Sequence, residues 1–275
     1  MKTSLCHNIV IVDSKPLARG QHFLSLKAPE LAAAARPGQF IHIRLPGEGM
    51  DPFLRRPLSI AAAFPAQGTI LLFFRLTGRG TAALARLQKG QLLHCLGPLG
   101  KGYSWPSAKQ KPLLVAGGIG VAPLWFLKQA LQRKKIPFYF FWGASSVDHF
   151  FYLHDFNSKK ELLVLATDDG SVGYHGPITK PVELFLQNKQ GDVKIYACGP
   201  VPMLKSLQRI ALHYGASLEI SLEERMACGI GACLGCAVRV KAADDHQSSC
   251  HYSRVCADGP VFKGEEVILS DEPGS

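Results

Sequence analysis

Hydrophobic residues in the first hundred positions form short runs that turn residues separate. The apolar runs are Ile9–Val12, Phe23–Leu26, Phe40–Leu45, Leu58–Ala63, Ile70–Leu76 and Leu92–Leu96. Pro-Gly pairs at 37–38 and 46–47, together with Gly68, lie between runs and are typical of turns. Short strands at this spacing predict a small antiparallel barrel, with a short helix over Ala82–Leu87 at one end.

The pattern changes after about residue 104, where compact apolar runs begin to alternate with helical stretches. Strands are expected at Leu113–Ala116, Phe138–Trp142, Leu162–Thr167 and Lys194–Cys198, and helices at Ala122–Arg133, Val182–Gln187 and Pro202–His213. This alternation predicts a doubly wound α/β sheet. The remainder holds a cysteine motif, a polar hairpin tip over Lys241–Ser253 and a final strand at Val267–Leu269. We expect an α+β multidomain chain, with a barrel domain over 1–104, an α/β domain over 105–222 and a small third domain over 223–275.

Composition narrows the classes of protein that this chain can be. Its 31 basic and 21 acidic residues give a formal charge of +10, but the basic residues are scattered and predict solvated faces rather than a nucleic-acid site. No stretch of 18 apolar residues occurs, so no membrane span is expected. The start of the chain lacks a secretory pattern, and eight cysteines in 275 residues do not resemble a disulfide framework. A cytoplasmic location is therefore expected.

Three cysteines near the C-terminus carry the most specific pattern in the chain. Cys228, Cys233 and Cys236 have the Cys-x4-Cys-x2-Cys spacing of a plant-type [2Fe–2S] site, which needs one further distant thiolate. Glycines in the first gap allow the backbone to turn its N–H groups toward the sulfurs. A zinc knuckle would instead favour two equivalent Cys-x2-Cys pairs, and no second pair follows. The spacing alone leaves the fourth ligand open between Cys250 and Cys256.

A cluster that moves single electrons needs other redox partners, and the barrel sequence offers a flavin site. An arginine that begins a strand can bind a phosphate in two-point fashion, and a serine three positions later can reach the polar edge of a flavin ring. Glycines before the short helix free backbone N–H groups for a pyrophosphate. The alternatives are exposed strand-end charges and a plain glycine turn. The candidate FAD-binding residues are Arg56, Pro57, Leu58, Ser59, Phe73, Phe74, Arg75, Gly80 and Thr81.

A second nucleotide site is expected in the α/β region. Gly117, Gly118 and Gly120 follow a buried strand and open a helix, with Pro123 in place of the last glycine of the usual dinucleotide motif. No acidic ribose-binding residue follows the second strand, which runs into residues 143–146, and no arginine occurs between 133 and 209. The lack of a partner for a 2′-phosphate favours NAD over NADP.

The last strand of the alternating region ends in Cys198-Gly199-Pro200. A small thiol at the carboxyl end of a parallel strand lies where a nicotinamide ring would rest, which makes Cys198 the candidate catalytic residue, with Gly199 and Pro200 as cofactor contacts. A buried structural cysteine is the alternative.

In this order, these motifs resemble the ferredoxin reductase-like superfamily, and within it the family of electron-transfer subunits of type B dihydroorotate dehydrogenases. The resemblance covers essentially the whole chain. It rests on residues 56–59, 80–81, 117–123, 167–171, 198–200, 228–236 and 255–262. The family motif Val-Cys-x-Asp-Gly-Pro-Val-Phe selects Cys256 as the fourth cluster ligand. One departure from the superfamily is Leu58, which stands where tyrosine is frequent.

The resemblance implies an electron path and a partner. A catalytic subunit would oxidise dihydroorotate on its own FMN, and electrons would pass through the [2Fe–2S] cluster and FAD of this chain to NAD⁺, in pyrimidine biosynthesis. A two-plus-two heterotetramer is implied by the same likeness. The alternatives are a diaphorase-like subunit of an NAD(P)H:ferredoxin or sulfide oxidoreductase, and a non-enzymatic iron–sulfur module.

Overall fold

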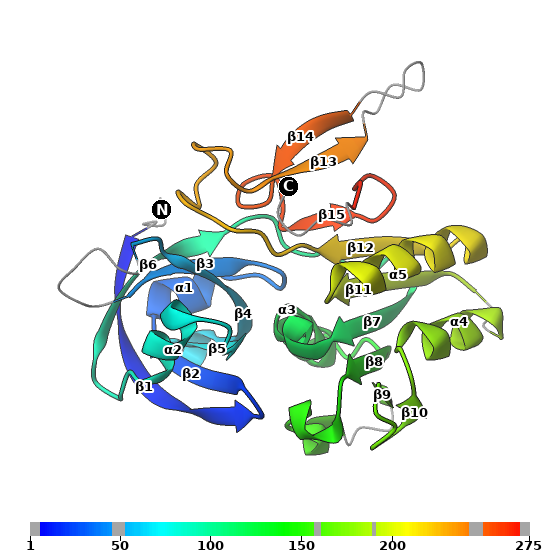
Figure 1. Cartoon of the computed structure of the whole chain (residues 1–275), viewed down its shortest axis with the longest axis horizontal. Helices are drawn as coiled ribbons and strands as arrows, with labels where there is room; N and C mark the ends of the chain where they lie inside the picture. The colour runs from blue at the N-terminus through cyan, green and yellow to red at the C-terminus, as the bar shows by residue number, and fades with distance from the viewer. Residues whose placement is uncertain (1–5, 46–52, 157–160, 189–190, 242–249, 270–275) are drawn as a thin grey trace.

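The computed structural model of the chain describes residues 6–45, 53–156, 161–188, 191–241 and 250–269. Three parts are visible in Figure 1: a barrel, a sheet with helices beside it, and a C-terminal segment that lies over both. Among the described residues, no helix is both long and apolar enough to cross a membrane.

The first part is a closed barrel of antiparallel strands in the order β1-β2-β5-β4-β3-β6. Its strands are β1 (Cys6–Ala18), β2 (Gln21–Lys27), β3 (Phe40–Arg44), β4 (Arg56–Phe64), β5 (Thr69–Arg75) and β6 (Leu92–Leu99). Alternate residues such as Leu24, Ile41, Ile43 and Leu72 are fully buried inside it, because successive strand side chains point to opposite faces. The predicted barrel and its six strands are therefore present.

Two short helices accompany the barrel. The helix predicted near residue 82 is α2 (Arg79–Ala85), whereas α1 (Pro29–Ala34) was not predicted. Proline at the start of α1 suits the first helical turn, and Leu31 and Ala32 bury its inner face. Six residues with an alanine run give too little periodicity to predict such a helix.

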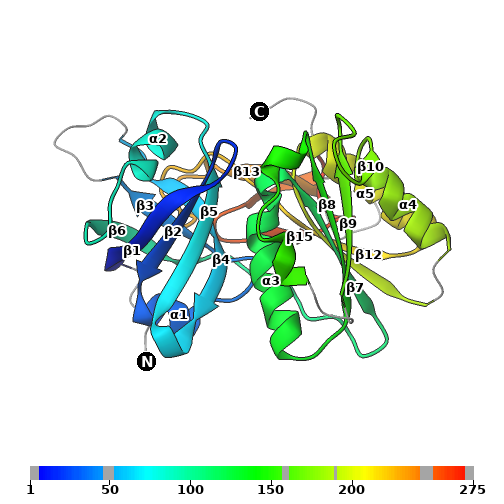
Figure 2. The ribbon, with the colours of Figure 1, turned by 90° about the horizontal axis from the view of Figure 1, so that it is seen from below.

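The second part is a seven-stranded sheet in the order β10-β9-β8-β7-β11-β12-β15. Its strands are β7 (Lys111–Gly117), β8 (Phe138–Ala144), β9 (Glu161–Thr167), β10 (Tyr174–His175), β11 (Val193–Cys198), β12 (Ser217–Ser221) and β15 (Val261–Lys263). Helix α3 (Val121–Arg133) covers the face toward the barrel, and α4 (Thr179–Gln187) and α5 (Val201–Tyr214) cover the other (Figure 2). The sheet is doubly wound because β8 and β11 lie on opposite sides of β7. Ligands of such sheets bind at the carboxyl ends of the strands at this switch point.

The C-terminal part is joined to the sheet rather than separate from it. Strands β13 (Ala237–Lys241) and β14 (Cys250–Arg254) form an antiparallel hairpin, whose tip lies outside the described residues. Strand β15 then pairs with β12, placing Phe262 opposite Ile220. The strand predicted at Val267–Leu269 is wrong: the pairing residues lie earlier, and Val267 makes only a single bridge to Val240.

Three groups of buried side chains hold the parts together. One fills the barrel, and a second lies between α3 and the sheet. The third covers the opposite sheet face and extends to Cys236, Val255 and Cys256 of the C-terminal part. Barrel and sheet meet through Phe73, whose ring lies edge-on to Trp125 at 5.9 Å between centroids. The C-terminal part therefore shares a hydrophobic core with the sheet.

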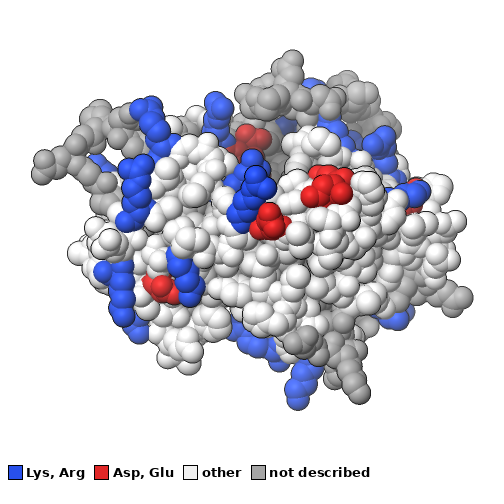
Figure 3. Space-filling model, turned by 60° about the horizontal axis from the view of Figure 1, so that its bottom comes forward, with Lys and Arg blue, Asp and Glu red and all other residues white. Residues whose placement is uncertain are grey.

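The surface charge matches the expectation of solvated faces. On the face shown in Figure 3, lysine and arginine side chains lie in separate small groups over several elements, with acidic side chains beside some of them. They do not merge into one stripe on that face, which is the footprint that a nucleic-acid backbone would require.

Candidate functional site

The predicted phosphate-binding residues of the barrel come together where β4 begins and α2 starts. The guanidinium of Arg56 lies so close to Gly80 that any side chain at position 80 would overlap its Nε. Thr81 Oγ1 accepts hydrogen bonds from the backbone N–H groups of Thr77 at 2.9 Å and Gly78 at 3.2 Å, and so fixes the glycine turn. A guanidinium beside a helix start is a suitable site for a pyrophosphate.

The neighbouring arginine, Arg55, makes a different contact. Arg55 Nη1 donates to the carbonyl of His94 in β6 at 3.2 Å, whereas Arg56 Nη1 donates to the nearby carbonyl of Leu54 at 2.6 Å. Arg55 therefore links barrel strands. It is not an exposed strand-end charge.

The other candidate flavin residues are spread over two environments. Pro57, Leu58 and Ser59 are half-buried on β4, beside Arg56. Phe74 lies in the barrel core, while Phe73 packs against Phe151 with ring centroids 5.2 Å apart, and Arg75 is exposed. The structure thus gathers Arg56, the β4 residues, Gly80 and Thr81, and the roles of the three β5 residues stay predictions.

The glycine loop and the Cys-Gly-Pro turn lie against each other at the switch point of the sheet. A side chain at Gly120 would overlap the carbonyl oxygen of Cys198, and one at Gly117 would come within 2.6 Å of Pro200. Trp142 Nε1 donates to the carbonyl of Gly118 at 3.1 Å and supports the loop from β8. These contacts explain why glycine is needed there and leave backbone N–H groups near the start of α3.

Cys198 is a buried thiol at the end of β11. Burial, followed by the charge of Glu223, raises its pKa well above the ordinary value, so the side chain is a neutral thiol at pH 7. Such a group can contact a ring without carrying a charge. A role as thiolate nucleophile does not fit this environment.

Glu223 is a candidate site residue that the sequence analysis does not include. It keeps contact with solvent, yet surrounding protein desolvates its carboxyl group and raises the pKa. Its charge also acts on Cys198, which places it on the same side of the sheet switch point. A single glutamate after a short unpredicted strand carries no motif that could have revealed it.

Two acidic residues that follow β9 lie beside the end of β8, where the sequence offered no acidic residue to bind a ribose. Backbone N–H groups of Asp168 and Asp169 donate to the carbonyls of Ala144 and Ser145, and so bring this loop beside the end of β8. Ser171 Oγ donates to Asp169 Oδ1 at 2.6 Å, and its hydrogen bonds lower the pKa of Asp169. The acidic residues nearest the end of β8 therefore follow the third strand of the sheet, β9, and not the second.

The four predicted cluster cysteines are arranged as two pairs. Cys228 has a side-chain contact with Cys233, and the Cys256 thiol has one with Cys236. Within the described part of the chain, no three His, Cys, Asp or Glu side chains converge on a single ion position. Two pairs suit a [2Fe–2S] cluster, in which each iron takes two protein ligands, whereas a structural zinc ion needs four around one point.

Backbone N–H groups point at these sulfurs, as a cluster site requires. Cys228 Sγ accepts from Ile230 at 3.5 Å and Ala232 at 3.3 Å, and Cys256 Sγ accepts from Gly231 at 3.2 Å. Desolvation acts to raise the pKa of Cys228, but these donors and Cys233 outweigh it and lower the pKa to about 6. Burial and the neighbouring Cys236 raise the pKa of Cys256 to about 12.

The hairpin register separates the two candidates for the fourth ligand. Cys250 pairs with Lys241 at the far end of the hairpin, while Arg254 pairs with Ala237 next to Cys236. Four strand steps correspond to ~13 Å, so Cys250 lies well away from the other thiols. Instead it accepts a hydrogen bond from Arg239 at 3.4 Å. The register therefore favours Cys256, and its role as the fourth ligand stays a prediction.

An ion pair fixes the turn that carries Cys256. Asp258 accepts hydrogen bonds from the backbone N–H and Nε of Arg254, both at 2.9 Å, and this arginine lowers the pKa of Asp258 to about 2. Arg254 Nη1 also donates to the carbonyl of Gly231 at 2.8 Å. The pair therefore joins the two segments that bear cluster thiols.

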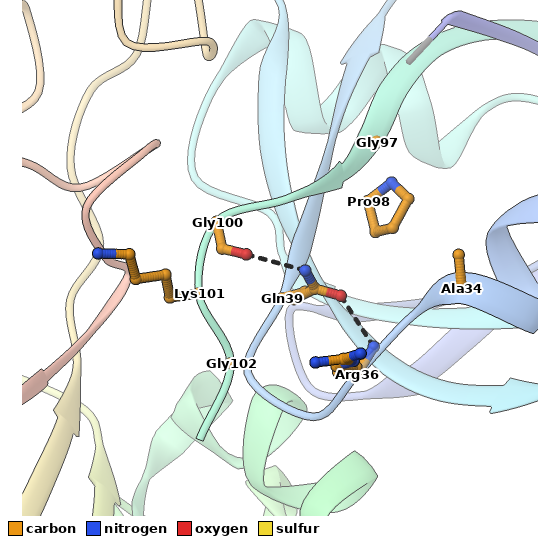
Figure 4. A pocket seen from close by; sticks show the side chains of 8 residues that line it. All are labelled: Ala34, Arg36, Gln39, Gly97, Pro98, Gly100, Lys101 and Gly102. Carbon is orange, nitrogen blue, oxygen red and sulfur yellow. Dashed lines mark hydrogen bonds between the residues drawn. The ribbon is translucent and has the colours of Figure 1, made fainter. Parts of the chain in front are cut away.

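A separate hollow of about 530 Å³ shares no residue with these sites. Gln39 crosses it, donating to the carbonyl of Gly100 at 2.8 Å and accepting from the N–H of Arg36 at 2.9 Å (Figure 4). Arg36 and Lys101 also line this hollow, and we assign no ligand to it.

Comparisons with known proteins agree with this geometry. Residues 223–268 match the family described as the iron–sulfur cluster binding domain of dihydroorotate dehydrogenase B, and residues 114–209 match the oxidoreductase NAD-binding domain. A solved NADH-dependent reduced ferredoxin-NADP oxidoreductase superposes with a TM-score of 0.82 at 29% identity, over 94% of this chain and 89% of that one. A ferredoxin NADP⁺ reductase from Neisseria gonorrhoeae with bound FAD and NADP, at 19% identity and a TM-score of 0.65 over 81% of this chain and 94% of that one, shares the fold.

Curated relatives match almost end to end. The dihydroorotate dehydrogenase B (NAD⁺) electron transfer subunit of Geobacillus thermodenitrificans is 39% identical over 95% of this chain and 98% of its own length. That of Desulforamulus reducens is 36% identical over 92% of this chain and 94% of its own length. With its barrel, its NAD-binding sheet and its paired cluster cysteines, the chain belongs to the family of electron-transfer subunits of NAD-dependent dihydroorotate dehydrogenase B.

Proposed function

We propose that this chain carries electrons from the FMN of a dihydroorotate-oxidising subunit, through a [2Fe–2S] cluster and FAD, to NAD⁺ in pyrimidine biosynthesis. The observation that carries the proposal is a contact between two parts of the chain. The turn of Cys228 and Gly229 packs on His42 of β3, and β3 is paired with the flavin strand β4. A cluster held by that turn would therefore lie directly beside the flavin site.

The cofactors supply complementary chemistry: nicotinamide exchanges a hydride, the cluster takes one electron, and a flavin can hold either number. The chain's own residues hold and separate these groups. Arg56 and the turn of Gly80 and Thr81 would bind the FAD pyrophosphate. The loop at Gly117–Gly120 and the neutral thiol of Cys198 would receive the nicotinamide nucleotide at the end of the sheet.

The cluster loop also offers a surface for the catalytic partner. Ile230 and Leu234, on either side of Cys233, are 55% and 62% exposed. Large apolar side chains beside a redox centre suit a protein partner, because electron transfer requires close approach and apolar contacts exclude water. We place the FMN-containing subunit on this loop and infer a two-plus-two heterotetramer, as the resemblance implies. The cytoplasm is the compartment we infer, since no described cysteine forms a disulfide.

A second candidate function has one observation in its favour. The superposed NADH-dependent reduced ferredoxin-NADP oxidoreductase shares 29% identity over nearly the whole chain. A diaphorase-like subunit that delivers electrons to a ferredoxin or sulfide partner would have the same cofactor order. The identity of the partner subunit distinguishes the two functions.

Copurification followed by a coupled assay tests the proposal. The chain should copurify with an FMN-containing subunit, and the complex should reduce NAD⁺ with dihydroorotate. The partner alone should reduce an artificial dye with dihydroorotate but should not reduce NAD⁺. A complex that binds another flavoprotein and does not oxidise dihydroorotate would favour the second candidate.

A further inference from the structure

His42 occupies an unusual position on the outside of the barrel. Its neighbours Ile41 and Ile43 point into the barrel core, so His42 faces away from that core, yet its side chain is completely buried. Within the described residues, neither Nδ1 nor Nε2 has a hydrogen-bond partner of good geometry. An imidazole buried in this way costs free energy relative to an apolar side chain of similar size, which calls for a functional explanation.

The group that buries His42 is the cluster loop. Gly229 lies so close that a side chain there would overlap Nδ1 of His42, while Cε1 and Cγ would be 3.1 and 3.2 Å from it. Gly229 has a φ of +73°, which also favours glycine. The backbone groups of Arg55 and Cys228 lie close enough to act as weak hydrogen-bond partners of the ring. The Nδ1 edge therefore faces the turn that carries the first predicted cluster thiol.

His42 also lies next to the proposed flavin site, because its strand, β3, pairs with β4. In the pairing of β3 with β4, His42 lies opposite Pro57, and the flanking pairs are Ile43 with Arg56 and Ile41 with Leu58. His42 is thus the side chain that connects the proposed flavin strand to the cluster turn.

We propose that His42 is a positioning residue of the electron path, whose imidazole seats the Cys228–Gly229 turn on the flavin barrel. The Nδ1 edge sets the place of the first thiolate and the polarity on that side of the cluster. It thereby controls how the cluster and FAD share an electron. The inference rests on the assignment of Cys228 to the cluster.

Two substitutions of nearly equal size separate polarity from packing. His42→Asn keeps a polar group near the Nδ1 position, and His42→Leu removes it. In protein purified with both cofactors, we expect His42→Leu to change the paramagnetic signal of the reduced cluster. The electron distribution between FAD and cluster should change about tenfold, which is ~59 mV for a one-electron couple. His42→Asn should stay near wild type, and NADH should reduce FAD at the same rate in both.

The polar role of His42 would be overturned if His42→Leu and His42→Asn had the same cluster signal and potential. This holds whether both variants are normal or both lack the cluster. If Cys228→Ser retains a normal cluster, the ligand assignment itself fails, whatever His42 does. Those two failures are therefore distinguishable.

A pair of substitutions tests the contact between His42 and Gly229 directly. Gly229→Ala should lower cluster content severalfold, and adding His42→Ala should recover part of it, because the overlap with the ring is removed. Gly231→Ala is the matched control, since Gly231 also has a positive φ of +84° but its Cβ would meet Ala257 and Arg254 instead. Adding His42→Ala to Gly231→Ala should give no recovery. Equal recovery in both pairs, or none with Gly229→Ala, would contradict the contact.

Discussion

A Cβ atom at position 120 would overlap the carbonyl oxygen of Cys198, so no side chain fits at Gly120. This contact joins the nucleotide loop after β7 to the turn after β11. Gly120→Ala should force the two turns apart and lower kcat/KM for NADH-dependent flavin reduction by at least about tenfold, since small displacements of a bound reactant have large effects on rate. Stopped-flow measurement of flavin bleaching by NADH checks this.

Gly118→Ala is the control for that experiment. Gly118 has a φ of +53°, but nothing lies within 4 Å of the position of its Cβ. It therefore adds backbone strain of about 1–2 kcal/mol, and a methyl group beside the nucleotide, without a clash against Cys198. Equal losses in the two variants would show that the contact with Cys198 is unimportant.

Arg56→Ala should yield folded protein depleted in FAD. A lost charge-assisted phosphate contact costs roughly 1.5–3 kcal/mol, or about tenfold to more than a hundredfold in affinity. Gly80→Ala should weaken FAD binding in the same direction, because the new methyl group displaces the guanidinium. Flavin content per chain and FAD titration provide the measurement. Arg86→Ala, an exposed arginine at the opposite end of α2, should leave FAD binding unchanged.

Asp169 should set the preference for NADH. Its carboxylate is held by Ser171 next to the end of β8, where a 2′-phosphate would meet a like charge. Asp169→Ser should raise the ratio of kcat/KM for NADPH to that for NADH by about tenfold, the value of 1.4 kcal/mol. The control is Asp192→Asn, which removes a charge at the amino end of the same sheet. An unchanged ratio in Asp169→Ser would place the ribose elsewhere.

Cys256→Ser should abolish the visible absorption and the paramagnetic signal of the cluster, whereas Cys250→Ser should leave both intact. The hairpin register places only Cys256 beside Cys236. Dye reduction by NADH through FAD should survive in Cys256→Ser, while electron transfer to the partner should be lost. Loss of the cluster in Cys250→Ser would contradict the assignment.

Asp258→Asn should speed the loss of the cluster on warming, because the pair with Arg254 holds the Cys256 turn. The pKa of Asp258 is lowered to about 2 by Arg254, so its stabilisation is complete above the unfolded-state pKa of about 3.9 and is lost only as the pH falls toward 2. The difference in melting temperature between wild type and Asp258→Asn should therefore stay constant from pH 8 to pH 5. A difference that varies within this range would assign the effect to another group. The pair is partly exposed, and solvent screening keeps its contribution small.

The parts of the fold that could be predicted are those with strong local patterns. Alternating apolar residues determine the barrel strands, and strand-helix alternation determines the doubly wound sheet. Helix α1 and strand β12 were missed because each is short and lacks a distinct period. The strand expected at Val267–Leu269 has the right residue types, but β12 pairs with the earlier segment.

The candidate site residues that could be predicted are likewise those that belong to a local sequence motif. The glycine loop and the cysteine motif could be recognised because their spacing is itself the requirement of the ligand. Glu223 and His42 could not, because each acts through a neighbour distant in sequence, and the motif at 167–171 gave no role for Asp169. Asp169 reaches the end of β8 only through backbone hydrogen bonds between two loops, and His42 meets Gly229 across 187 positions.

Strand β15 has a consequence for the solubility of the chain. It covers the outer edge of β12, where backbone groups flanking the buried Ile220 would otherwise be open to pairing. An uncovered strand edge is a template for association with other chains. The segment that carries the last cluster ligand thus also shields the sheet. Release of the iron would loosen that shield, and we expect oxidative damage to the cluster to end in aggregation.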